Sequence, residues 1–123
     1  MIQQDIRQSL LNDPAIHAIV SDRIFLNNPI QQSGNNPYIV FSRQNKTRDM
    51  VSEQNTFQFS VFSQDLVVLQ NLCDDIISFF ENRKNLNGNE YFSLSLLNQT
   101  DGRSRLDNGF YWSTLTFEFK NVT

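Results

Sequence analysis

Residues 63–83, SQDLVVLQNLCDDIISFFENR, decide the fold of this chain. At 100° per residue, the apolar side chains of this stretch gather on one half of a helical cylinder and the polar ones fall on the other half. Only Val67 is misplaced, and Ser63 and Asp65 suit the start of a helix as cap and as acidic residue. The apolar half comprises Leu66, Val68, Leu69, Leu72, Cys73, Ile76, Ile77, Phe79 and Phe80. The spacing therefore predicts one long amphipathic helix.

Such a wide apolar face needs a broad apolar partner, and the flanking sequence predicts a sheet. Residues 37–43, 56–62, 90–99 and 110–120 are β-type stretches in which apolar and polar side chains alternate. Alternation indicates a sheet with one buried face, which favours antiparallel pairing. The expected buried face comprises Phe57, Phe59, Val61, Phe92, Leu94, Leu96, Leu115, Phe117 and Phe119. We therefore expect an α+β fold with about four antiparallel strands and the long helix packed on one face.

The N-terminal third predicts two shorter helices. Residues 2–11 carry apolar side chains at helical spacing, so a short helix should pack beside the long one. Asp13 and Pro14 then suit the cap and first position of a further helical segment that ends near Val20. Arg23 is expected to pair with Asp22 or to reach a helix carbonyl. With 123 residues and no evident linker, the chain is expected to form a single domain, residues 1–123.

Composition argues against several classes of function. The net charge of −3 and the sequence pI near 4.9 do not favour direct recognition of nucleic acid, which needs clustered Lys and Arg. One cysteine, Cys73, excludes an internal disulfide and any Cys-based zinc site. No apolar run resembles a signal peptide or is long enough to cross a bilayer, so we expect no membrane association and folding in the cytosol.

Catalytic and cofactor-binding patterns are not evident in the sequence. His17 is the only histidine and has no neighbouring nucleophile, and Asp74 and Asp75 diverge around the helix instead of forming an acid–base pair. We therefore expect no enzyme activity, cofactor or metal. Arg103 and Arg105 could bind a phosphate or carboxylate; in the alternative interpretation they form a charged hairpin neutralised by nearby aspartates.

Two regions are candidates for contact with other proteins. The first is a polar connection at residues 43–55, expected to be a long hairpin, in which Arg43, Lys46, Arg48, Asp49 and Met50 are the candidate contact residues. The second is the hairpin tip near Arg103 and Arg105. Trp112 is expected on the less apolar sheet face, which is either half-exposed or a contact surface, since Trp supplies large rigid contact area.

The order and spacing of several segments resemble the tail-completion, or head–tail joining, proteins of long-tailed bacteriophages and prophages. These segments are Leu10-Leu11, Asp-Pro-Ala-Ile at 13–16, Val-x-Asp-Arg-Ile-Phe at 20–25, Pro-Tyr-Ile-Val-Phe at 37–41, the long helix, and Tyr-Trp-Ser-Thr-Leu-x-Phe at 111–117. The resemblance spans nearly the whole chain. The Asn- and Gln-rich loop at 27–36 and a long helix that is not strongly acidic depart from the family pattern.

The resemblance implies a non-enzymatic virion assembly protein at the head–tail junction. Proteins of this family form rings, often hexameric, that terminate the tail tube or join the tail to the head connector. The implied partners are further copies of the chain, the tail-tube protein and the head-connector protein, and the isolated chain could be monomeric. Two alternatives stay open: a connector on the head side, and a small ligand-binding α+β domain or enzyme with an anion site near Arg103 and Arg105.

Overall fold

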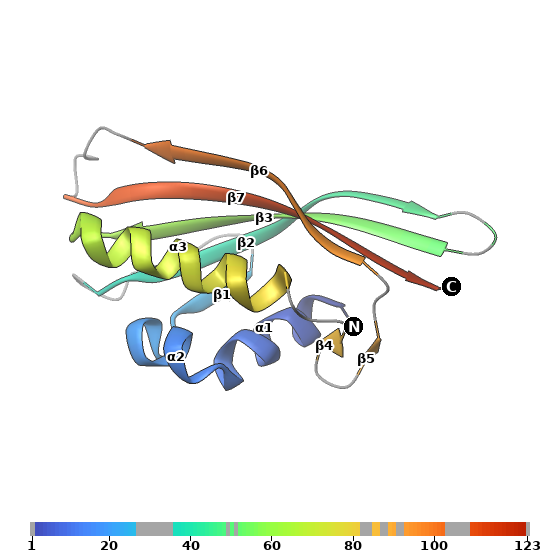
Figure 1. Ribbon diagram of the computed structural model, residues 1–123, viewed down its shortest axis with the longest axis horizontal. Helices are drawn as coiled ribbons and strands as arrows, with labels where there is room; N and C mark the ends of the chain where they lie inside the picture. Colours follow the sequence, from blue (N-terminus) through green and yellow to red (C-terminus); the bar gives the residue numbers. More distant parts are fainter. Residues whose placement is uncertain are drawn as a thin grey trace.

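The computed structural model describes residues 2–26, 36–48, 50, 52–81, 85–86, 89–90, 93–102 and 109–122. The elements follow in the order α1 (Ile2–Asn12), α2 (Pro14–Val20), β1 (Ile24–Leu26), β2 (Tyr38–Arg48), β3 (Ser52–Ser63), α3 (Leu66–Glu81), β4 (Asn85–Leu86), β5 (Asn89–Glu90), β6 (Ser93–Gly102) and β7 (Tyr111–Val122). Figure 1 shows α3 lying along one face of a long twisted sheet, with α1 and α2 beside it. The predicted α+β fold is confirmed.

The sheet has more strands than the sequence predicts. Its order is β1-β2-β3-β7-β6, and its last four strands are antiparallel as expected. The expectation of about four strands was too low, because β1 adds a parallel edge beside β2, with Ile24 opposite Ile39, and β4 and β5 form a separate pair. These extra strands have only two or three residues each, too few for alternation to reveal them.

One apolar core lies between α3 and the sheet. Phe80 of α3 sits at its centre, with its ring 5.3 Å from Phe59, 4.9 Å from Phe117 and 5.4 Å from Phe119 between ring centroids. The other buried members are Ile6, Leu10, Ile16, Val20, Ile24, Ile39, Phe41, Phe57, Val61, Leu69, Leu72, Cys73, Ile76, Phe79 and Leu115. The predicted buried face is confirmed for the described side chains, of which Leu96 is half-buried but packs against the core. Phe92 and the side chain of Leu94 lie outside the described residues.

The first turn of α3 differs from the prediction. The cap is Asp65, whose Oδ1 accepts hydrogen bonds from the backbone N–H groups of Val67 at 2.9 Å and Val68 at 3.3 Å. Ser63, the predicted cap, instead accepts from the Asp65 N–H at 3.1 Å. The helix begins at Leu66, so the Leu66 side chain lies in the first turn and is 44% exposed. Leu66 was predicted on the apolar face but is not part of it. Val67 is exposed, as predicted.

Two arginines join the helices to the sheet through backbone carbonyls. Arg23 Nε donates to the carbonyl of Pro37 at 2.8 Å, and its Nη2 donates to the carbonyl of Ile19 at 2.9 Å. Arg7 of α1 donates from Nε to the carbonyl of Ile24 at 2.9 Å. The helix-carbonyl alternative for Arg23 is therefore the one observed. These contacts fix α1 and α2 against the β1 edge and the start of β2.

Beyond the helices the sheet continues as a narrower projection (Figure 1). Residues 43–55 were expected to be a hairpin connection, but most of them are strand: the β2–β3 ladder runs out to Arg48 opposite Glu53, and β7 follows β3 as far as Val122 opposite Ser52. We call this projection the arm: residues 45–48 of β2, Met50, residues 52–55 of β3 and residues 120–122 of β7. The half of the sheet covered by helices is the body.

Candidate protein-contact surfaces

Two lysines of the arm are paired with nearby glutamates. Lys46 Nζ lies 3.6 Å from Glu53 Oε1, and Lys120 Nζ lies 3.0 Å from Glu118 Oε1. Gln54 Nε2 donates to the other oxygen of Glu118 at 2.9 Å. Partly exposed ion pairs of this kind contribute about 0–1 kcal/mol each to stability. They reduce the number of unpaired ions that a neighbouring protein would have to cover, although Arg48 adds an exposed positive charge.

The carboxyl of Glu53 is held in its charged form. A hydrogen bond from the Asn55 amide, 3.2 Å between Nδ2 and Oε1, lowers the pKa of Glu53, and the positive charges of Lys46 and Arg48 lower it further. Burial raises the pKa of Glu53, but by less than these interactions together lower it. The arm therefore keeps its Lys46–Glu53 pair at neutral pH.

The root of the arm contains buried polar atoms that lack partners. The Arg43 guanidinium lies over the Phe57 ring, 5.7 Å from its centroid. Asn55 is fully buried on the same face of the sheet. Neither Arg43 Nε nor Asn55 Oδ1 has a hydrogen-bond partner among the described residues. A buried acceptor left unpaired costs about 1–3 kcal/mol, so the arm is less well stabilised at its root than the body is in its core.

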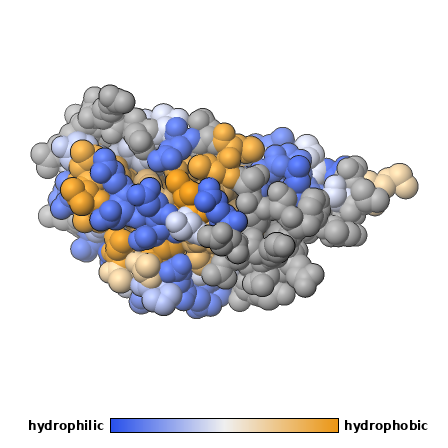
Figure 2. Space-filling view, in the orientation of Figure 1, coloured by the Kyte–Doolittle hydropathy of each residue, from blue (hydrophilic) through white to orange (hydrophobic). Residues whose placement is uncertain are grey.

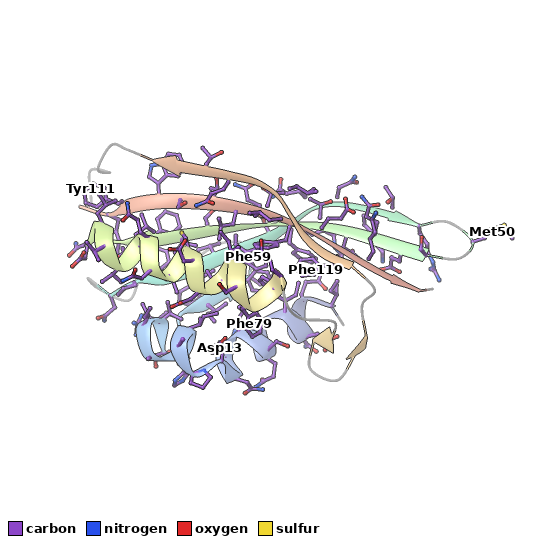
Figure 3. All side chains as sticks on the ribbon, viewed as in Figure 1. Asp13, Met50, Phe59, Phe79, Tyr111 and Phe119 are labelled. Carbon is purple, nitrogen blue, oxygen red and sulfur yellow. The ribbon has the colours of Figure 1, made fainter. Side chains whose placement is uncertain are left out.

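The end of the arm presents an exposed methionine. Met50 is 97% exposed and lies at the far tip in Figure 3. Figure 2 shows the coloured surface of the arm as mainly hydrophilic up to a pale hydrophobic group at its far end. Methionine is flexible and polarizable, so it suits a contact that must adapt to its partner. Asp49, another predicted contact residue, lies outside the described residues.

The opposite end of the sheet carries a second, smaller apolar cluster on the face away from α3. Tyr38 stacks on Phe62 with ring centroids 4.7 Å apart and meets Phe110 edge-on at 5.5 Å. Val40 and Phe25 complete the cluster, and burial raises the pKa of the Tyr38 hydroxyl. Most of this cluster is already buried within one chain, so it is mainly a packing feature, not an open contact surface.

The predicted contact residues therefore fall into two separate places. Lys46, Arg48 and Met50 lie on the arm, and Arg43 lies at its root. Trp112 lies opposite Phe62 at the other end of β7, half-buried on the face away from α3, where the sequence placed it. Arg103 and Arg105 lie outside the described residues, so the anion-site alternative has no described geometry. The sequence predicts that a small sheet has open strand edges, but it does not show which strands carry them, because strand order cannot be read from alternation alone.

The groups considered for catalysis do not form a reactive centre among the described residues. His17 is exposed on α2, and Asp74 is exposed on α3. Burial raises the pKa of the neighbouring Asp75, helped by the charges of Asp13 and Asp74. The described part of the chain contains no group of three His, Cys, Asp or Glu side chains suited to hold a metal ion. None of the described helices has the length and apolar character needed to cross a bilayer.

Comparison with known proteins identifies a similar fold. No known family and no curated protein matches the sequence. Among solved structures, the chain is similar to a chain in the virion of a native gene transfer agent particle, with a TM-score of 0.76. The match covers 99% of this chain and 95% of that chain at 14% sequence identity. At this identity the similarity establishes a shared fold over nearly the full length of both chains.

Proposed function

We propose that this chain is a non-enzymatic structural protein of a phage-like virion, located at the head–tail junction, where copies form a ring that terminates the tail tube or joins it to the head connector. The observation that carries the proposal is the end-to-end structural match to a chain of a gene transfer agent virion. The resemblance of several sequence segments, in their order and spacing, to tail-completion proteins supports the same assignment. The polar arm, whose lysines are paired with glutamates, supports a role in protein contact.

The arm is the proposed contact with the neighbouring virion proteins. A ring needs head-to-tail interfaces, in which two different surfaces of each subunit meet. The arm supplies one such surface, because it extends beyond the helices and ends in the exposed Met50. The proposed partners are the tail-tube protein, the head-connector protein and further copies of this chain, six in the complete ring. The free chain is proposed to be a monomer that assembles on the tail end.

Disrupting the gene in the genome that encodes this chain tests the proposal directly. We expect separate DNA-filled heads and unjoined tails, and we expect an epitope label on the restored chain to appear at the junction in electron micrographs. Label found elsewhere on the particle, or normal joined particles without the chain, would contradict the proposal.

A matched pair of charge reversals tests the role of the arm. Arg48→Glu changes an exposed side chain on the arm, whereas Glu81→Lys changes an exposed side chain at the end of α3. We expect Arg48→Glu to reduce infectious particles strongly and Glu81→Lys to leave them unchanged. Both purified variants should show urea unfolding close to that of the parent chain. Normal titres from Arg48→Glu would remove the arm from the interface.

A further inference from the structure

We propose that, in the ring, the outer edge of β6 in one copy pairs with the arm portion of β2 in the next copy, so that the sheet continues from subunit to subunit. This inference rests on the proposed ring and specifies the interface that builds it. Four observations support it: β2 and β6 have open edges, these edges lie at the same position along the strands, the two strands run in opposite directions, and their charges differ.

β6 and the arm portion of β2 both have open edges in the described structure. β6 pairs with β7 on one side, and no described strand pairs with its other side. β1 covers β2 only from Ile39 to Phe41, so β2 is open from Ser42 to Arg48. Open edges present unpaired backbone N–H and C=O groups, which favour pairing with another strand.

The two open edges lie at the same level along the sheet. Following the register across the four antiparallel strands, Thr47 is level with Gln54, Lys120 and finally Ser93. In the same way, Arg43 is level with Leu96. A second copy related by simple rotation about an axis along the strands therefore brings its open β2 segment opposite residues 93–96 of β6.

The strand directions and the side-chain faces also agree at this register. β2 runs in the same direction as β7, and β6 runs opposite to both, so β6 and the neighbouring β2 meet antiparallel. Arg43 and Leu96 share the face that carries α3: Leu96 packs against the core and Arg43 lies over Phe57. Pairing in this register keeps the helices of every copy on one side of the continued sheet.

Charge and bulges disfavour the competing pairings. The open β2 edge carries Arg43 and Arg48, besides Lys46, which is paired with Glu53, so two such edges would bring like charges together, whereas β6 contains no Lys or Arg. β2 and β6 each have a bulge in the described register, at Gln44 in β2 and at Leu97 in β6, while the β3–β7 ladder has none. Bulges interrupt an edge and limit random pairing. Because β1 already occupies the β2 edge that is level with Gln99 to Asp101, the pairing is confined to residues 93–96 of β6, and β6 turns away from the neighbouring copy at its Leu97 bulge.

Cysteine cross-linking within assembled particles tests this interface. In a Cys73→Ala background, the matched variant carries Thr47→Cys and Ser93→Cys, which are level across the sheet. The control carries Thr47→Cys and Thr100→Cys, because Thr100 is seven residues further along β6, roughly 20 Å away. Within one chain, β2 and β6 are separated by three strand spacings, about 14 Å, which is too far for a disulfide. Any cross-link in the matched variant must therefore join two copies.

We expect oxidised particles of the matched variant to give a ladder of cross-linked multimers that ends at the number of subunits in the ring. The control should give only monomer on a denaturing gel. Equal ladders from both variants, or dimers from Ser93→Cys alone, would overturn the proposed pairing. Particles that contain the matched variant at the junction but give no cross-link would overturn the pairing and leave the proposed function intact. Particles that lack the chain altogether would overturn both.

Discussion

The body and the arm are two halves of one sheet with opposite chemistry on the same face. In the body, this face is lined by phenylalanines beneath α3, such as Phe59 and Phe117. In the arm, the same positions of β3 are taken by Asn55 and Glu53. Burying a phenylalanine contributes about 1.5–3 kcal/mol, whereas an exposed ion pair contributes about 0–1 kcal/mol. Most of the stability of the chain therefore comes from the body, whereas the arm mainly provides an exposed polar surface.

Truncating the centre of the body tests this division with the largest expected effect. Phe80→Ala removes a fully buried ring that contacts four other phenylalanines, so we expect a loss of about 3–5 kcal/mol in the free energy of unfolding, measured in urea. Met50→Ser on the arm should change it by less than about 0.5 kcal/mol. Comparable losses from the two variants would show that the arm shares the stability of the body.

Removing the α3 cap should have a smaller effect on the body. Asp65→Ala leaves the N–H groups of Val67 and Val68 without their side-chain acceptor, so we expect a loss of about 1 kcal/mol in thermal or urea unfolding. Asp65→Ser keeps a short side-chain acceptor and should recover most of the loss. An equal loss in both variants would mean that the charge of Asp65, not its hydrogen bonding, matters.

At the root of the arm, a polar-to-apolar change should increase stability. Asn55→Val removes a buried acceptor without a described partner and suits a strand position beneath apolar neighbours. Because the variant also loses the hydrogen bond to Glu53, we expect a gain of only about 1 kcal/mol in unfolding free energy. The matched variant Asn55→Ala should be less stable than Asn55→Val. A loss of stability with valine would show that the asparagine is satisfied in solution.

The smallest effect concerns the pH dependence of the arm. Because the pKa of Glu53 is lowered in the folded chain, its contribution to stability is present above the ordinary glutamate pKa of 4.5 and is lost as the pH falls through the lowered value. NMR titration should find the Glu53 carboxyl below 4.5, and Asn55→Ala should move it upward more than Lys46→Gln does. The reverse order would assign the shift chiefly to the lysine.

Much of the body could be predicted from sequence, because its elements carry long periodic patterns. The apolar spacing from Leu69 to Phe80 gave the helix, and alternation around Phe59 and Phe117 gave the inner strands. The start of the long helix was harder to predict from sequence. Ser63 and Asp65 are both good caps, and the choice between them depends on where the strand before the helix ends. The three residues of β1 were missed because they pair with a strand a dozen residues away.

The candidate contact residues were predictable only in part. Arg43, Lys46 and Arg48 were recognised as one polar group, but they were placed in a connection because polar side chains on both faces conceal a strand. The charged side chains give no indication that the β2–β3 ladder continues through these residues. The open edges of β2 and β6 depend on the strand order, which no local pattern specifies, so the proposed junction between copies required the structure.

The uninterrupted ladder between β3 and β7 has a mechanical consequence. Twelve paired rows run without a register shift from Ser52 opposite Val122 to Ser63 opposite Tyr111, so they cross from the tip of the projection into the phenylalanine core. Tension applied along these strands loads all rows in shear at once, instead of opening them one by one as in a zipper. A force on the outer end is therefore carried directly into the most tightly packed part of the molecule.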